Sequence, residues 1–182
     1  MNMPNRITLL RVVLIPVFIF FMLSNIANNV IYAIVIFAAA SLTDALDGYL
    51  ARKYNQITTF GKLMDPLADK MLIISALICF LELNVRYVNS VVLILVIFRE
   101  LLITGFRLIA MTENKVIAAG SLGKLKTIIQ IATVLAVMFD MLIPLKFGSF
   151  DLILWLIIAM VAITVYSGIE YIVSNKELLK FK

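Results

Sequence analysis

Four aspartates lie in the first half of the chain at spacings that fit two helix faces: Asp44, Asp47, Asp65 and Asp69. The first two are three residues apart and the last two are four apart, so each pair lies on one face of a helix. The short connection between the pairs predicts antiparallel neighbouring helices with all four carboxylates at one depth. Carboxylates in an apolar setting repel one another unless cations neutralise them. The pattern therefore predicts a divalent-metal site suited to chemistry on a phosphorylated substrate.

The residue types available narrow the choice of metal and of general base. Hard oxygen ligands without cysteine or histidine favour Mg²⁺, Mn²⁺ or Ca²⁺ over zinc. Four aspartates are enough to hold two bridged ions, as in two-metal phosphoryl-transfer sites, and we expect two ions of Mg²⁺ or Mn²⁺. The chain has no histidine, so a general base must be Asp, Glu, Lys, Tyr or Cys.

Three very small residues share the helix faces of the aspartate pairs. Gly48 and Ala51 lie four and seven residues after Asp44 and continue its face, and Gly61 precedes Asp65 by one turn. Such residues let a bulky group approach the helix backbones. They are also common at tight helix–helix contacts in membranes. Beside the aspartates, we favour the substrate-binding interpretation.

The composition indicates that lipid is the solvent for much of the chain. Hydrophobic residues make up 63% of the 182, against roughly 45–50% in soluble domains, and the mean hydropathy is +1.07. A membrane-spanning helix needs about 20 mostly apolar residues. We therefore predict one all-α integral membrane domain over residues 1–182, a bundle of six transmembrane helices: Ile7–Leu23, Val30–Leu50, Leu63–Leu83, Val88–Ile109, Leu125–Ile143 and Phe150–Val173.

Lysine and arginine are distributed unequally between the two predicted membrane faces. Of the 16, all but Arg86 and Lys146 lie on the side that carries both termini. Because basic residues favour the cytoplasmic side, we predict that both termini and the aspartates are cytoplasmic. The net charge of +5 then fits basic segments facing an anionic leaflet, and we expect no nucleic-acid partner.

The spacing Asp44-x2-Asp47-Gly48-x2-Ala51-Arg52-x8-Gly61-x3-Asp65-x3-Asp69 resembles the signature of the CDP-alcohol phosphatidyltransferase family without a departure. The six predicted helices also match the family, so the resemblance covers essentially the whole chain. It implies an enzyme that joins a CDP-linked lipid to a second alcohol and releases CMP.

The resemblance also implies roles for individual residues. The metal ligands would be Asp44, Asp47, Asp65 and Asp69, with Asp69 also acting as the catalytic base. The residues that receive the cytidine diphosphate part of CDP-diacylglycerol would be Asp44, Asp47, Gly48, Ala51, Arg52, Gly61 and Asp65. The resemblance further implies a homodimer in the plasma membrane of a bacterium, with the active site at the cytoplasmic side.

Three other segments are similar to the branch of this family that forms phosphatidylglycerophosphate in bacteria. They are Pro4-Asn5-x2-Thr8-x2-Arg11-x4-Pro16, Arg99-Glu100-Leu101 with Arg107, and Gly120-Ser121-x-Gly123-Lys124-x-Lys126-Thr127. The acceptor in that branch, glycerol 3-phosphate, is a small dianion whose phosphate needs cationic donors. The candidate donors are Arg99, Arg107, Lys124, Arg11, Lys126 and Ser121, the last beside backbone N–H groups expected at a helix N-terminus.

Other interpretations stay open at this point. The lysines could serve membrane topology alone, Lys126 could extend to the interface, and Arg99 could form a local ion pair with Glu100. Inositol phosphate is the nearest competing acceptor, and serine would need fewer cations. A divalent-cation transporter is disfavoured because the aspartates cluster toward one membrane face. A lipid-binding scaffold would have no need for a fourth aspartate.

Overall fold

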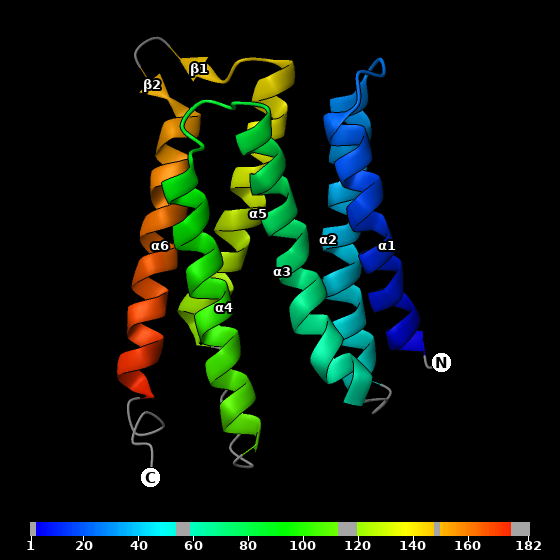
Figure 1. Cartoon of the computed structure of the whole chain (residues 1–182), viewed down its shortest axis with the longest axis vertical. Coiled ribbons are helices and arrows are strands. Elements are labelled where there is room, and N and C mark those ends of the chain that lie inside the picture. The colour runs from blue at the N-terminus through cyan, green and yellow to red at the C-terminus, as the bar shows by residue number, and fades with distance from the viewer. Residues whose placement is uncertain (1–2, 54–58, 113–119, 148–149, 176–182) are drawn as a thin grey trace. The chain divides into compact units, whose positions relative to one another are not determined.

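The structure is a computed structural model. It describes the backbone of residues 3–53, 59–112, 120–147 and 150–175, and side chains within 8–43, 67–68, 70–108, 110, 120–145 and 151–175. The described part contains six helices and one two-stranded antiparallel ribbon (Figure 1). These elements are α1 Met3–Leu23, α2 Asn29–Lys53, α3 Thr59–Glu82, α4 Ser90–Thr112, α5 Ser121–Leu142, β1 Lys146–Phe147, β2 Phe150–Asp151 and α6 Leu152–Ser174.

The predicted all-α fold with six helices is confirmed, and each helix lies within a few residues of the apolar stretch that predicted it. One difference is at α5, which begins at Ser121 instead of Leu125. The Gly120 carbonyl accepts hydrogen bonds from the backbone N–H groups of Gly123 and Lys124, at 3.1 and 3.4 Å, and these bonds form the first turn.

Two compact units make up the chain. Unit 1 comprises Met1–Val85 and Val134–Pro144, and unit 2 comprises Arg86–Thr133 and Leu145–Lys182. Helix α5 therefore contributes its first half to unit 2 and its second half to unit 1. A single domain over residues 1–182 stays a prediction.

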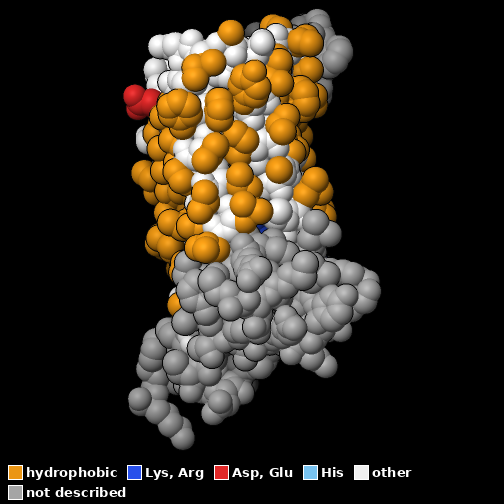
Figure 2. Space-filling view, turned by 90° about the vertical axis from the view of Figure 1, so that its right-hand side faces the viewer, with side chains coloured by type: hydrophobic (Ala, Val, Ile, Leu, Met, Phe, Trp, Pro, Cys, Tyr) orange, Lys and Arg blue, Asp and Glu red, His pale blue; other side chains and the backbone are white. Residues whose placement is uncertain are grey.

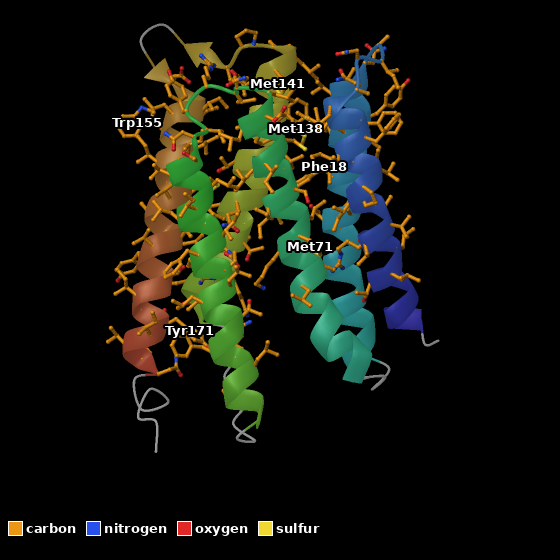
Figure 3. All side chains as sticks on the ribbon, in the orientation of Figure 1. Phe18, Met71, Met138, Met141, Trp155 and Tyr171 are labelled. Atoms are coloured by element: carbon orange, nitrogen blue, oxygen red, sulfur yellow. The ribbon has the colours of Figure 1, made fainter. Side chains whose placement is uncertain are left out.

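In unit 1, α1 packs along α2 and α3. The Phe18 ring of α1 lies against Phe37 of α2 with their centroids 5.7 Å apart, and both side chains are fully buried (Figure 3). The buried side chains of α1 recur every three or four residues, the spacing of one helix face. They are Thr8, Arg11, Ile15, Phe18 and Met22.

In unit 2, α4 packs against α6. The Arg86 guanidinium forms an ion pair with the Asp151 carboxylate at 3.1 Å, and the Tyr87 hydroxyl donates a hydrogen bond to the same carboxylate at 3.0 Å. Asp151 directly precedes α6, so these contacts fasten the segment before α4 to the start of α6.

The described surface exposes many large hydrophobic side chains, and Figure 2 shows them spread over the described part of one face. Trp155 of α6, for example, is 55% exposed (Figure 3). Helices α5 and α6 are each long and apolar enough to cross a membrane, by length and composition. An apolar surface of this extent is unfavourable in water, so these features indicate a membrane-embedded protein. Six spans and cytoplasmic termini stay predictions.

Candidate active site

The four aspartates lie on two antiparallel helices of unit 1. Asp44 and Asp47 belong to α2, and Asp65 and Asp69 belong to α3. The two helices contact each other and run in opposite directions, with the end of α2 beside the start of α3 (Figure 1). The aspartate side chains lie outside the described part of the structure, so their predicted convergence is not tested by contacts.

The positions of the two pairs along their helices nevertheless match. Asp47 lies six residues before the end of α2 at Lys53, and Asp65 lies six residues after the start of α3 at Thr59. With a rise of about 1.5 Å per residue, each is roughly 9 Å from its helix end. Antiparallel helices joined at these ends therefore carry the two aspartate segments at one level.

The buried side chains of α2 show which of its faces leads to the aspartates. Ala33, Phe37 and Ala40 are fully buried at a spacing of four and then three residues. The next steps of four and three along the helix reach Asp44 and Asp47. By helical register, this pair continues the face that α2 buries in unit 1.

The same reasoning applies to α3. Ala68, Leu72 and Ala76 are buried at a spacing of four residues. Three residues before Ala68 lies Asp65, and three residues before Leu72 lies Asp69. The aspartate pair of α3 therefore also continues a buried helix face.

The set of donors suits a hard divalent cation. Carboxylate oxygens are the ligands that Mg²⁺ and Mn²⁺ favour. Among the side chains that the structure describes, no three His, Cys, Asp or Glu residues are grouped closely enough to hold a metal. The candidate ligands thus remain the aspartates of α2 and α3.

The other residues predicted to receive the CDP-linked lipid lie in the same two helices. Gly48, Ala51 and Arg52 belong to the last turns of α2, and Gly61 belongs to the first turn of α3. Their side-chain positions are outside the described residues, and their roles stay predictions.

Arg11 is a fully buried cation in unit 1, on the face of α1 that also buries Thr8. Helices α1 and α2 are packed and antiparallel, so the first half of α1 runs beside the second half of α2 (Figure 1). A buried guanidinium is costly unless anionic groups balance it. We therefore expect the aspartates of α2 to balance the charge of Arg11. A role for Arg11 in binding acceptor phosphate stays a prediction.

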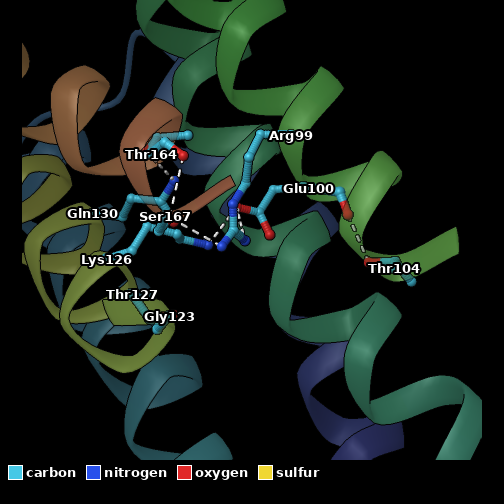
Figure 4. A network of polar contacts seen from close by, with 9 residues as sticks. All are labelled: Arg99, Glu100, Thr104, Gly123, Lys126, Thr127, Gln130, Thr164 and Ser167. Carbon is cyan, nitrogen blue, oxygen red and sulfur yellow. Dashed lines mark hydrogen bonds and ion pairs between the residues drawn. The ribbon is translucent and has the colours of Figure 1, made fainter. Parts of the chain in front are cut away.

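In unit 2, Arg99, Glu100 and Lys126 form a buried polar network (Figure 4). The Lys126 ammonium and the Arg99 guanidinium both contact Glu100 Oε1, the latter at 3.5 Å. A second terminal nitrogen of Arg99 donates to the Ser167 hydroxyl of α6 at 3.1 Å. Glu100 is 3% exposed and Lys126 is 5% exposed. The local ion pair of Arg99 with Glu100 is therefore real, and Lys126 does not extend to the interface.

One hydrogen bond between α5 and α6 and one within α6 continue this network. The Gln130 amide donates to the Thr164 hydroxyl at 3.5 Å, and the Ser167 hydroxyl donates to the Thr164 carbonyl at 3.1 Å. All three side chains are buried. The network thus ties α4, the first half of α5 and α6 together inside unit 2.

Arg107 lies two turns after Arg99 on α4. Its guanidinium carbon is 5.9 Å from the ring centroid of Tyr171 on α6, a cation–π distance. Among the described residues, the Nε atoms of both arginines and the Tyr171 hydroxyl have no hydrogen-bond partner. Arg99 and Arg107 therefore each keep one Nε–H donor without a partner among the described residues.

Lys124 and Ser121 lie in the first turn of α5 with exposed side chains. Within the part of unit 2 that the structure describes, neither contacts the Arg99 network. The backbone N–H of Lys124 already donates to Gly120, so this donor, which was expected to be available to an anion, is occupied.

Sequence reasoning assigned no functional role to Glu100, Ser167, Gly168 or Tyr171. A carboxylate within an apolar helix is a signal that could have drawn attention to Glu100, because intramembrane charges usually face a partner. The two small residues and the tyrosine carry no such signal, since their contacts depend on which helix packs against α6.

Known proteins resemble this chain over nearly its whole length. The CDP-alcohol phosphatidyltransferase family matches residues 1–167. A Bacillus subtilis protein named CDP-diacylglycerol–glycerol-3-phosphate 3-phosphatidyltransferase is 41% identical over 98% of this chain and 97% of its own. A Haemophilus influenzae protein of the same name is 32% identical over 94% and 91% of the two chains. A probable phosphatidylglycerophosphate synthase of Mycobacterium tuberculosis is 36% identical over 94% and 80%. As the aspartate motif predicted, the chain belongs to the CDP-alcohol phosphatidyltransferase family.

Proposed function

We propose that this protein transfers the phosphatidyl group of CDP-diacylglycerol to glycerol 3-phosphate, giving phosphatidylglycerophosphate and CMP. The observation that carries the proposal is the placement of two aspartate pairs at one level of the antiparallel helices α2 and α3. The family membership supports the transfer reaction, and the names of the Bacillus and Haemophilus relatives support glycerol 3-phosphate as the acceptor.

The aspartate motif has a defined part in this reaction. Asp44, Asp47, Asp65 and Asp69 would hold Mg²⁺ or Mn²⁺, which when bound neutralises the pyrophosphate and stabilises the leaving CMP. Gly48, Ala51 and Gly61 leave room for the nucleotide beside the helix backbones, and the Arg52 guanidinium adds positive charge for its phosphates.

Asp69 is the general base of the proposed step. Its carboxylate takes the proton of the acceptor hydroxyl, whose oxygen attacks the phosphorus that bears the diacylglycerol. The bond from that phosphorus to the bridging pyrophosphate oxygen breaks, and its electron pair leaves with CMP. Positioning and electrostatic stabilisation supply most of the rate in such transfers.

The cations of unit 2 are the proposed site for the acceptor's phosphate. Arg99 and Arg107 are supported by their N–H donors without partners, and Lys126 by its burial next to Arg99. Lys124 and Ser121 are exposed at the start of α5 and would add charge and a hydroxyl group. Arginine suits this task because its planar fork of donors fits phosphate oxygens.

The membrane arrangement follows from the charge distribution. We infer six transmembrane spans with both termini in the cytoplasm, in the plasma membrane of a bacterium, with the aspartate-bearing helix ends at the cytoplasmic side. The support is that all but two of the 16 lysines and arginines fall in segments that the six predicted spans would put on that side. A homodimer is part of the same proposal.

A panel of acceptors tests the function directly. Purified protein would receive CDP-diacylglycerol, Mg²⁺ and one of glycerol 3-phosphate, inositol 1-phosphate or serine, and CMP release would be measured. We expect release with glycerol 3-phosphate. A preference for inositol 1-phosphate or serine would contradict the assigned acceptor, and no release with any of them would contradict the transferase activity.

A further inference from the structure

Glu100 is a buried carboxylate held between two cations that the proposed function assigns to the acceptor's phosphate. We propose that Glu100 is the positioning residue of this phosphate site, which holds Arg99 and Lys126 in the arrangement that binds the anion. The inference rests on the proposed function, and it adds a residue with no direct part in binding or chemistry.

The first argument is geometric. The Arg99 and Lys126 nitrogens both contact one atom, Glu100 Oε1. Two donors that can share one carboxylate oxygen are close enough to share one phosphate oxygen or two oxygens of the same phosphate. Glu100 therefore sets the spacing between an α4 cation and an α5 cation before any anion arrives.

The second argument concerns the orientation of the guanidinium. One terminal nitrogen of Arg99 contacts Glu100 at 3.5 Å and the other donates to Ser167 at 3.1 Å. These two contacts, on opposite ends of the planar group, fix the direction of the plane. The Arg99 Nε has no hydrogen-bond partner in the described part of the chain, so a donor is left for a ligand in a fixed orientation.

The third argument is electrostatic. Arg99 and Lys126 carry two positive charges and Glu100 one negative charge, so the carboxylate reduces the repulsion between two cations that both contact it. Without the carboxylate, the two cations would repel each other in a setting of low dielectric constant and separate. Glu100 thus permits two cations to stay adjacent where an anion needs both.

Stability alone does not explain the arrangement. A buried ion pair contributes little net stability, because desolvation offsets the attraction, and apolar residues of similar volume often serve as well. Groups that must be held in a productive geometry, in contrast, need supporting hydrogen bonds from their neighbours. The Arg99 Nε donor that is left over favours this second role.

Kinetics of Glu100 variants test the inference. Glu100→Gln keeps the side-chain size but removes the charge, and we expect the KM for glycerol 3-phosphate to rise on the order of tenfold. The KM for CDP-diacylglycerol should not change, and Glu100→Asp should restore part of the loss. Glu82, the last residue of α3, has an exposed carboxylate. Glu82→Gln is therefore the matched control, and both of its KM values should equal those of wild type.

An unchanged KM for glycerol 3-phosphate in folded Glu100→Gln would overturn the inference, as would an equal rise in both KM values. If that variant does not fold, Lys126→Met is compared with Glu100→Gln/Lys126→Met, and neither of these has a buried ammonium at position 126. The double variant should have a higher KM for glycerol 3-phosphate than Lys126→Met, because Arg99 no longer contacts a carboxylate at position 100. Equal KM values in these two variants would refute the positioning role. A wild-type protein that releases no CMP would instead reject the proposed function itself.

Discussion

Gly168 of α6 lies directly against the side chain of Arg99. A Cβ atom at position 168 would stand 3.1 Å from Arg99 Cγ and 3.9 Å from its Nε. The neighbouring Ser167 hydroxyl accepts a hydrogen bond from the same arginine. The Arg99 side chain therefore packs against Ser167 and Gly168 of α6, and it also contacts Glu100.

Replacing this glycine should disturb phosphate binding more than folding. Gly168→Ala would push the Arg99 side chain aside by a few tenths of an ångström, and an arginine side chain is flexible enough to yield. We expect a rise of about three- to tenfold in the KM for glycerol 3-phosphate, since small errors of position weaken binding in such sites. The KM for CDP-diacylglycerol should stay constant in the same assay.

Gly105 of α4 is a matched control for this change. A Cβ atom there would meet nothing within 4 Å, and alanine is favoured over glycine inside a helix by about 0.5–1 kcal/mol. Gly105→Ala should therefore raise the melting temperature slightly and leave both KM values unchanged. Equal kinetic effects of the two substitutions would show that the contact with Arg99 is not what matters at position 168.

The proposed base gives a second prediction. Asp69→Asn keeps the size of the side chain but cannot accept the hydroxyl proton, and loss of a general base costs about 10²–10⁴-fold in rate. We expect CMP release to fall by this factor while the protein still inserts in the membrane and elutes as wild type in size-exclusion chromatography. Asp140→Asn, on α5, is the control and should retain activity. Near-normal turnover of Asp69→Asn would remove Asp69 from the role of base.

The contacts around Asp151 give a prediction about stability. The hydrogen bond from Tyr87 to Asp151 is 3.0 Å long, and a typical hydrogen bond contributes about 0.5–1.5 kcal/mol net. Tyr87→Phe should therefore lower the free energy of unfolding by this amount, measured by thermal unfolding in detergent, without altering either KM. Tyr166→Phe is the matched control, because Tyr166 is 61% exposed and its hydroxyl has no hydrogen bond to another described residue. The same loss in both variants would show that the Asp151 contact contributes nothing specific.

The membrane arrangement gives a fourth prediction. In a Cys79→Ala background, a cysteine replaces either Ala27, between α1 and α2, or Ser174, at the end of α6; both positions are exposed. A maleimide that cannot cross membranes should label Ala27→Cys in intact cells and Ser174→Cys only after the membrane is opened. The reverse pattern, or labelling of both in intact cells, would be incompatible with six spans and cytoplasmic termini.

The sequence predicted those features that depend on local spacing. Apolar stretches of helical length located all six helices, and the register of Asp44 with Ala40 and Phe37 follows from a period of three and four residues. The start of α5 was predicted at Leu125 because the polar residues before it interrupt the apolar run. Hydrogen bonds to the Gly120 carbonyl instead begin the helix at Ser121.

Contacts between distant segments could not be predicted in this way. Lys126 is 26 residues from Glu100, and Ser167 is 68 residues from Arg99. Which polar groups meet depends on how α4, α5 and α6 pack, and a single sequence does not contain that information. Sequence reasoning thus found the cations of unit 2 and the possible ion pair of Arg99 with Glu100, but not the contact of Glu100 with Lys126 or that of Gly168 with Arg99.

Metal binding without substrate is the most direct test of the central claim, that the aspartates of α2 and α3 hold the catalytic ions. Binding of Mn²⁺ to the purified protein would be followed by electron paramagnetic resonance, in wild type, in Asp44→Asn/Asp65→Asn and in the control Asp140→Asn. We predict saturable binding in wild type and the control, and its loss in the double variant, together with loss of CMP release when wild type is treated with a chelator. Equal Mn²⁺ binding in all three proteins would contradict the claim.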